Sequence, residues 1–498
     1  MNPDFNFLTL APVLIPALGT ILVLLLDTAF PRLGRAHWLI AALLLLGGAA
    51  TTAPILLDSA HRPRSTLCTG GSCWYAVDHL GAGLQLLALV SSLTVVLLAY
   101  PIRVVDERVP IQVALVLTST AGAVGVAGAH DLASLLITLE ISTLPLIALV
   151  VLRARHSAVD AGLNLLTTSL VSFAILAMGA GLWFAATGTA RLDVRPALVA
   201  GNQPDLRRIL VLAVVFIVAG LAFKLSLAPF HLWTAPTIGA ASLPVGTLLA
   251  TTSKVAAVAG LVALLRTVTD LSSASIASIG VLAVLSMTVG NIMALRERNA
   301  LRFLGWSTVA QSGWIVLPFT TVSTDSGRRS AQYLAIYVLA SLVAFAVVTA
   351  IAHAQGRQHV TRITSYAGLL RRRPFLGGAL ALALLTFAGL PPAIAGLAAK
   401  VVALQSIIGD RLWVLAVLAA LNAMLGVAVY LRWIAIMLAP VRQADAAEPG
   451  MSGEHDHELA GAPDMDPVHP AHIGVVVVST VALVVCSVLP QAAFALFN

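Results

Sequence analysis

The sequence reads GLAFKLSLAPFHLWT at residues 220–234, which places a lysine and a histidine inside an apolar stretch. Lys224 lies five residues before Pro229 and seven before His231. About 20 apolar residues suffice for a bilayer-spanning helix, and a charge inside such a run is costly and usually functional. Proline removes a backbone donor and clashes with the preceding turn, so we expect this helix to break between residues 227 and 230.

The rest of the chain is equally apolar. Of its 498 residues, 59% are hydrophobic and 10% are charged, and the mean hydropathy is +0.95. Soluble domains carry about 25% charged residues. We therefore predict an all-α polytopic membrane protein with about 14 transmembrane helices, one for each apolar run. The runs are 7–27, 37–57, 79–100, 111–129, 132–152, 160–187, 208–227, 243–265, 273–295, 301–320, 331–354, 376–408, 411–439 and 472–495.

The positive charge of the chain is distributed between loops. The net charge is +7, and with both termini outside the membrane the inward loops hold 15 arginines and the outward loops 10. Cytoplasmic loops of membrane proteins carry an excess of Lys and Arg. We therefore attribute the charge to membrane topology rather than to nucleic-acid binding, and expect both termini outside.

Lysine and arginine occupy different parts of the sequence. The 26 arginines lie in loops or near the ends of spans, whereas all three lysines, Lys224, Lys254 and Lys400, lie inside apolar runs. Glu140 is the one acid in the middle of a span. Arginine keeps its proton, whereas a buried lysine can release it, so this segregation favours a proton relay. The alternatives are a lysine neutralised by Glu140, or one whose ammonium reaches the membrane surface.

A second interruption occurs in TFAGLPPAIAGLAAK, residues 386–400, where Gly and Pro precede Lys400. Two interrupted spans in corresponding positions indicate inverted repeats of a transporter, each of five helices with a broken fourth helix. A loop between two short helices is the alternative. We expect an N-terminal three-helix segment, two half-channel repeats, a polar inward loop and a last transmembrane helix. Their bounds are 1–109, 110–266, 267–440, 441–471 and 472–498.

Two polar segments have simpler explanations than a metal site. Cys68 and Cys73 flank a short loop that the topology places outside, where a disulfide is possible. Residues 448–470 hold three histidines and six acids, and a solvated connection between the last two spans accounts for them better than a metal does. We therefore expect no metal site.

Five segments, in order, resemble the antiporter-like membrane subunits of respiratory complex I, and in particular the N branch of that family in bacterial NADH–quinone oxidoreductase. The resemblance covers residues 110–440, and Lys400 together with the length of the chain favours the N branch. The segments are AHDLASLLITLEISTLP, FKLSLAPFHLWT, LLATTSKVAA, RNALRFLGWSTVAQSGW and FAGLPPAIAGLAAK.

The resemblance implies a role for each buried polar residue. Glu140 would pair with Lys224, and the positive charge of Lys224 would disfavour a proton on Lys254. A change in the Glu140–Lys224 distance would then send a proton toward Lys400, the terminal lysine. His231 would connect the first half-channel to the centre.

Three departures from the family pattern bear on these roles. WTAPTIGAASLP, residues 233–244, lacks the acidic turn that is common in the family. Gln311 stands where a histidine is common, and it can order water but cannot titrate. PPAIAG, residues 391–396, has one residue more than usual between the prolines and the glycine, which alters the geometry expected for the break.

The resemblance also implies where the other parts of the reaction take place. The chain has no CxxC cluster, dinucleotide fingerprint or haem motif. FMN, iron–sulfur clusters and quinone would therefore lie in partner subunits, with no cofactor on this chain. The expected partners are other membrane subunits of complex I, the lipid bilayer and protons, in a bacterial cell membrane. The alternatives are a subunit of an Mrp-type cation/proton antiporter and a scaffold without pumping activity.

Overall fold

The computed structural model describes most of the chain. The described residues are 5–30, 33–58, 63–69, 72–102, 108–268, 273–321, 323, 325–354, 362–440 and 467–497. Most of the polar loop predicted at 441–471, including His455 and His457, lies outside them, so the explanation given for that segment is not tested, whereas His469 lies within the described residues.

The first half of the chain contains eleven helices and a two-stranded hairpin within these residues. The elements are α1 (Phe7–Ala29), α2 (Ala36–Leu56), β1 (Arg64–Thr69), β2 (Ser72–Val77), α3 (His79–Ala99), α4 (Val109–Val126), α5 (Leu132–Val151), α6 (His156–Thr187), α7 (Val194–Gly201), α8 (Pro204–Leu225), α9 (Thr234–Ala240), α10 (Leu243–Ala250) and α11 (Thr252–Leu265).

All regular elements in the described part of the second half are helices. The elements are α12 (Ser273–Arg296), α13 (Ala300–Val316), η3 (Leu317–Thr320), α14 (Ser326–Ala354), η4 (Ile363–Tyr366), α15 (Leu369–Arg372), α16 (Pro374–Ala388), α17 (Ile394–Gly409), α18 (Trp413–Leu438), α19 (Pro470–Val488), α20 (Pro490–Phe494) and η5 (Ala495–Phe497).

Each predicted apolar run coincides with one or two of these helices. In the described part of the chain, 12 segments are long and apolar enough to cross a membrane. The broken run at 376–408 forms the two shorter apolar helices α16 and α17, and α13 accounts for the remaining run. The polytopic α-helical fold is therefore confirmed, while 14 spans and their inverted repeats stay a prediction. The last run ends earlier than expected, at Val488, because Pro490 begins a separate short helix.

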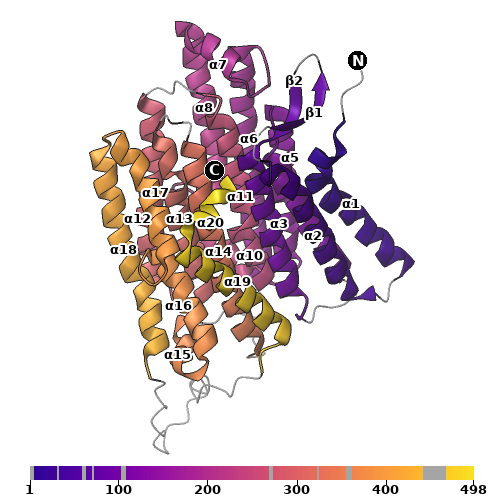
Figure 1. The fold of residues 1–498 in the computed structure, drawn as a ribbon, viewed down its shortest axis with the longest axis vertical. Helices are drawn as coiled ribbons and strands as arrows, with labels where there is room; N and C mark the ends of the chain where they lie inside the picture. Colours follow the sequence, from indigo (N-terminus) through magenta and orange to yellow (C-terminus); the bar gives the residue numbers. More distant parts are fainter. Residues whose placement is uncertain are drawn as a thin grey trace, which may run out of the picture.

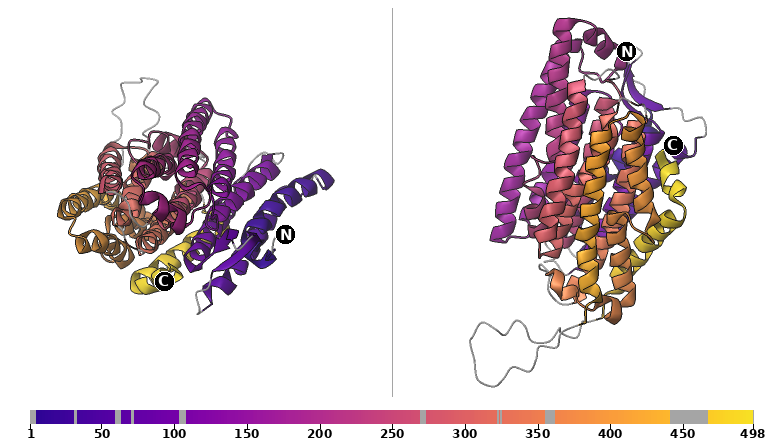
Figure 2. Two further views of the ribbon diagram at one scale, coloured as in Figure 1. Left: turned by 90° about the horizontal axis from the view of Figure 1, so that it is seen from above. Right: turned by 90° about the vertical axis from the view of Figure 1, so that its left-hand side faces the viewer.

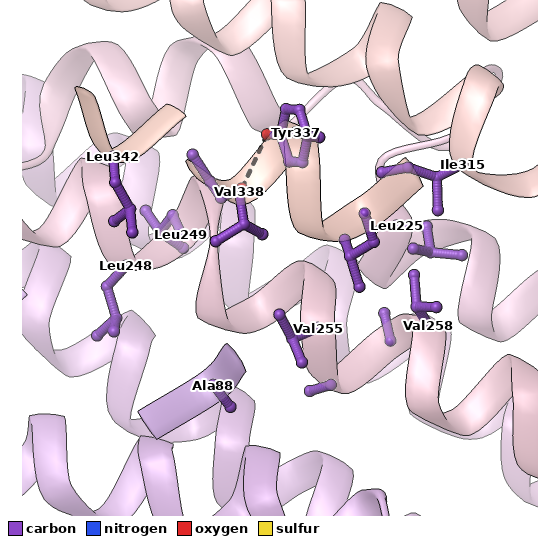
Figure 3. Close-up of a cluster of buried hydrophobic side chains, with 14 of the residues drawn as sticks. Ala88, Leu225, Leu248, Leu249, Val255, Val258, Ile315, Tyr337, Val338 and Leu342 are labelled. Carbon is purple, nitrogen blue, oxygen red and sulfur yellow. Dashed lines mark hydrogen bonds between the residues drawn. The ribbon is translucent and has the colours of Figure 1, made fainter. Parts of the chain in front are cut away.

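The helices stand side by side in one bundle (Figure 1). Seen end-on, the indigo N-terminal helices lie at one edge and the orange helix α18 at the opposite edge (Figure 2). The centre is formed by α10, α11 and α14, whose side chains are buried almost throughout. Leu249 of α10, Val255 of α11 and Val338 of α14 belong to this core (Figure 3).

Two of the three helix breaks follow from Pro and Gly in the sequence. Helix α8 ends at Leu225, and α9 begins at Thr234, which confirms the predicted break. Helix α16 ends at Ala388 and is followed by Gly389, which has φ +76°, and α17 begins at Ile394. The third break separates α10 from α11 at Thr251 (φ −117°, ψ −79°) and was not predicted.

The hairpin of β1 and β2 was not predicted either and is the exception to an all-α fold. Its strands are antiparallel, with Cys68 opposite Cys73, and the two sulfur atoms form a disulfide. Backbone hydrogen bonds join Ala76 to Gly128 at 3.0 Å and His130 to Trp74 at 3.2 Å. The hairpin therefore covers the loop between α4 and α5.

The segments that connect the helices lie at the two ends of the bundle. The hairpin and α7 lie at the upper end of the bundle in Figure 1, and α15 lies at the lower end. At the upper end, Arg266 after α11 forms an ion pair with Asp78 before α3 at 3.3 Å.

Candidate proton relay

The ion pair expected between α5 and α8 is present. Lys224 Nζ lies 2.9 Å from Glu140 Oε1 and 2.7 Å from the Thr143 hydroxyl, one helical turn further along α5. The side chains of Lys224 and Glu140 are 8% and 17% exposed. Lys224 is the only one of the three lysines paired with a carboxylate in the described part of the chain.

Lys254 is fully buried near the start of α11 and has only neutral partners among the described residues. Its ammonium group donates to the backbone carbonyl of Lys224 at 2.9 Å and to the Ser226 hydroxyl at 2.5 Å. It also lies 4.8 Å from the centre of the Trp233 ring. The last carbonyls of a helix have no intrahelical donor and carry partial negative charge, so the end of α8 is a binding site for a cation.

The break after α8 builds this binding site. Ser226 adopts a left-handed conformation (φ +63°, ψ 34°), which ends the helix and turns its hydroxyl toward Lys254. The Thr234 hydroxyl donates to the same oxygen at 2.6 Å. A non-glycine residue in this conformation is uncommon, and such residues persist where surrounding contacts hold them.

A small cavity lies beside Lys224. Its volume is about 30 Å³, and its wall includes hydroxyl groups of α5 and α6 as well as the lysine itself. Among these, Ser169 Oγ is buried and has no hydrogen-bond partner among the described residues. A water needs roughly 10–15 Å³ of such space and two or more polar partners. The cavity therefore has room for about two waters next to Lys224.

His231 lies beyond the break and is not bonded to either neighbouring lysine. Its side chain is buried beside Trp306, with ring centres 5.6 Å apart. Its Nδ1 atom has no hydrogen-bond partner among the described residues. The connection expected from His231 to the centre is therefore not a direct contact in this structure.

The unpredicted break at Thr251 frees a carbonyl that a tyrosine binds. The hydroxyl of Tyr337, which Figure 3 labels, donates to the Ala250 carbonyl at 2.8 Å. It also lies 3.0 Å from the Thr308 hydroxyl. Ala250 is one turn before Lys254, and Thr308 is on α13. Tyr337 thus joins the end of α10, directly before the break that precedes Lys254, to the second half of the chain.

Gln311 is at the centre of a group of hydrogen-bonded tyrosines. Its side-chain oxygen accepts from Tyr333 at 2.6 Å, and its nitrogen donates to the Tyr430 hydroxyl at 2.9 Å. The same nitrogen donates to the carbonyl of Phe387, near the end of α16, at 3.3 Å. Gln311 therefore connects α14, α18 and the second helix break by direct hydrogen bonds.

Lys400 lies at the break between α16 and α17. It is the last member of a row of buried polar groups that begins with Glu140 on α5. Its ammonium group donates to the carbonyl of Ala388, the last residue of α16, at 2.6 Å. It lies 5.2 Å from the centre of the Trp314 ring and is 5% exposed. Lys254 and Lys400 thus have the same surroundings, namely a helix-end carbonyl and a tryptophan face.

Sequence reasoning identified the charged residues but missed their neutral partners. Thr143 had a usable signal, because it follows Glu140 by three residues on one helix face. Ser226 and Trp233 lie in the quoted stretch that contains the break. Tyr333, Tyr337 and Tyr430 resemble ordinary core residues, so no local signal marks them.

The site offers little that could bind a metal. Within the described residues, no group of three or more His, Cys, Asp or Glu side chains is placed to hold an ion. The polar groups of the row are lysines, hydroxyls and amides, which bind and orient protons and water.

Comparisons with known proteins agree with this geometry. A family model described as NADH:quinone oxidoreductase/Mrp antiporter, TM, matches residues 129–426. NADH-quinone oxidoreductase subunit N of Salinispora tropica is 36% identical over 449 residues, which are 87% of this chain and 86% of that protein. The subunit N of Cereibacter sphaeroides is 33% identical over 447 residues, which are 90% of this chain and 92% of that protein.

Solved structures of complex I and of an Mrp complex share the fold of this chain but differ in their sequence identity to it. A chain of respiratory complex I from Thermus thermophilus has a TM-score of 0.77 and 27% identity, over 97% of this chain and 98% of that one. A chain of the Mrp complex from a Dietzia species has a TM-score of 0.82 but 19% identity, over 99% and 96%. The fold is therefore common to both complexes, whereas sequence identity favours the first. The chain belongs to the NADH-quinone oxidoreductase subunit N family.

Proposed function

We propose that this chain is the proton-translocating membrane subunit N of an NADH-quinone oxidoreductase, and that Glu140, Lys224, Lys254 and Lys400 carry the proton. The observation behind this proposal is the row of polar groups from α5 to α17, in which each lysine meets a freed carbonyl, a carboxylate or a hydroxyl. Family membership supports it, because the relatives are named as this subunit.

Movement of the Glu140–Lys224 pair is the proposed trigger. Lys254 binds the backbone of Lys224 directly, so a shift at the end of α8 changes the surroundings of both ammonium groups. Two positive charges near one another in a low-dielectric interior repel strongly. Strengthening or loosening the ion pair thereby alters how readily Lys254 holds its proton.

Hydroxyl and amide groups are proposed to connect Lys254 to Lys400. Tyr337 and Thr308 lie on the near side, and Tyr333, Gln311 and Tyr430 on the far side. Gln311 needs no charge for this role, because its amide holds two hydroxyls and a helix-end carbonyl in fixed positions. His231 is proposed to act on the access side, through water rather than by direct contact.

The remaining assignments follow from the same proposal. FMN, iron–sulfur clusters and quinone are placed in partner subunits, which supply redox energy. The chain lies in a bacterial cell membrane, with the hairpin end and both termini outside. Residues 110–266 and 267–440 act as two inverted half-channels, after an N-terminal segment of residues 1–109 and before a last helix in residues 472–498.

Affinity purification of the tagged full chain from its native membrane tests the assignment. We expect NADH dehydrogenase and iron–sulfur subunits to co-purify, and the reconstituted assembly to acidify one side of proteoliposomes when NADH and quinone are added. Co-purification with small cation/proton antiporter subunits instead would overturn the complex I assignment in favour of the Mrp type.

A further inference from the structure

A second cavity, of about 250 Å³, lies at the lower end of the bundle and takes no part in the lysine row. Arg108, Arg153 and His353 lie in its wall, together with Gln112 of α4. No carboxylate belongs to the wall as far as the described residues show. The described part of the wall therefore carries the positive charge of two arginines, and the cavity is large enough for a small anionic group.

Two arginines are held in place at this cavity by main-chain carbonyls. Arg108 donates to the Leu152 carbonyl at 3.2 Å. Arg153 donates from one nitrogen to the carbonyls of Ala240 and Ala241, at 2.6 and 2.7 Å.

The surroundings of Arg153 strengthen its attraction for an anion. Burial and the neighbouring Arg155 lower the pKa of Arg153 to about 10, so it stays positively charged at neutral pH. A charge that is partly withdrawn from water interacts more strongly with an opposite charge, because the local dielectric constant is low.

Two helices begin at the cavity and add partial positive charge. Helix α4 begins at Val109, directly after Arg108, and the first turn of α10 (Leu243–Val245) forms part of the wall. Ser242 precedes α10 but makes no side-chain capping hydrogen bond. The N-termini of helices favour phosphate and other anions, because unpaired N–H groups and the helix dipole both point toward them.

The rest of the wall is apolar. Trp38, Val95, Val116 and Leu149 come from four different helices and lie within about two turns of the charged ends of these helices. The charged groups lie where α4 begins and where α5 and α14 end, as the headgroup layer of a membrane requires. Basic pockets between transmembrane helices on the cytoplasmic side bind lipid headgroups.

We propose that this cavity binds the phosphate headgroup of an anionic membrane phospholipid, with Arg108 and Arg153 on the phosphate and an acyl chain along Trp38 and the apolar wall. The site goes beyond the proposed proton relay and does not depend on it. A neutral zwitterionic lipid would bind more weakly, because its ammonium group would meet the same positive charges.

Quenching of Trp38 fluorescence by brominated lipids tests this site in the full purified chain in non-ionic detergent. The Trp38 contribution is the difference between the natural protein and Trp38→Phe. We expect saturable quenching by brominated phosphatidylglycerol and at least about fivefold weaker binding of brominated phosphatidylcholine. Equal affinity for the two lipids, or no Trp38-specific quenching, would overturn the proposal.

Three substitutions that each lower the net charge by one distinguish binding in the cavity from a general electrostatic attraction to the protein surface. Arg108→Gln and Gln112→Glu should each weaken phosphatidylglycerol binding about fivefold. Arg372→Gln, in α15 at the same end, should leave it unchanged. If Arg372→Gln weakens binding as much as the cavity variants do, the attraction is a general surface effect and the site is rejected.

Inorganic phosphate distinguishes a lipid from a soluble anion. We expect millimolar phosphate to reduce quenching only weakly, because it lacks the acyl chain. If millimolar phosphate abolishes the quenching by phosphatidylglycerol, the acyl chain contributes no affinity, the cavity is assigned to a free anion and the lipid proposal is overturned.

Discussion

Lys254 donates to the backbone carbonyl oxygen of Lys224 at 2.9 Å, so two buried lysines from successive spans meet through the main chain. Only one of them has a carboxylate partner, Glu140. A displacement of the last turn of α8 therefore reaches Lys254 without any intervening side chain. The following predictions test this arrangement and the row that continues from it.

Lys254→Met should abolish or strongly reduce proton pumping while electron transfer and assembly persist. The substitution removes the group that binds the Lys224 carbonyl and Ser226 but keeps an unbranched side chain of similar size. The measurement is the proton-to-electron ratio of the assembled complex in proteoliposomes. Lys254→Arg is the matched control, because arginine keeps a positive charge but does not release its proton, and it should also pump poorly. A normal ratio in fully assembled Lys254→Met would rule out the relay.

Glu140→Gln should destabilise the chain by leaving the charge of Lys224 without its counter-ion. Removing one partner of a buried ion pair costs about 3–5 kcal/mol, and we expect the lower end because Thr143 still binds the lysine. Glu140→Gln with Lys224→Gln should recover at least half of that loss. The measurement is unfolding of the purified variants in detergent. Additive losses in the double variant would mean that the two residues do not stabilise one another.

Tyr337→Phe should slow proton pumping more than it slows electron transfer. It removes a single hydroxyl, which leaves the Ala250 carbonyl and the Thr308 hydroxyl without this partner, at a stability cost of about 1–3 kcal/mol. Tyr100→Phe, at the end of α3 and outside the row, is the control. Gln311→Leu should resemble Tyr337→Phe, whereas Gln311→His should retain part of the activity. Full pumping in both Tyr337→Phe and Gln311→Leu would show that protons travel elsewhere.

Gly396→Ala should destabilise the second helix break. A Cβ atom at this position would lie 2.0 Å from the Thr386 carbonyl oxygen, so the backbones of α16 and α17 would have to separate. Overpacking of this kind costs about 1–3 kcal/mol, occasionally more. Gly378→Ala is the control, since nothing lies within 4 Å of its added Cβ and alanine favours a helix by about 1 kcal/mol. The midpoint temperature of thermal unfolding should be lowest for Gly396→Ala, intermediate for the natural chain and highest for Gly378→Ala. Any other order would contradict the close approach of α16 and α17 at Gly396.

The orientation of the chain can be tested at the Cys68–Cys73 disulfide. Disulfides persist in oxidising compartments, so the hairpin is expected outside the cell membrane. In intact cells carrying Cys486→Ser, a membrane-impermeant reductant followed by an impermeant maleimide should label the chain. Labelling that requires permeabilised cells would place the hairpin, and with it both termini, inside.

The helices and the burial of the three lysines could be predicted from the sequence, because both depend on local pattern. Apolar runs of span length formed helices, and Pro229 and Gly389 marked two breaks. The break at Thr251 could not be predicted in this way, because LLATTSK contains neither proline nor glycine. The tyrosines around Gln311 meet only because α13, α14 and α18 pack together, and a single sequence does not specify which helices become neighbours.

The bond between Lys254 and the Lys224 carbonyl also affects how side-chain substitutions should be interpreted. An alanine at residue 224 removes the partner of Glu140 but retains the carbonyl that Lys254 binds. Alanine scanning therefore reports only half of what this residue does. Replacing the amide between residues 224 and 225 by an ester weakens that carbonyl as an acceptor, removes the N–H of Leu225 at the end of α8, and leaves every side chain intact. Such backbone chemistry, rather than further side-chain replacement, reaches the link between the two lysines.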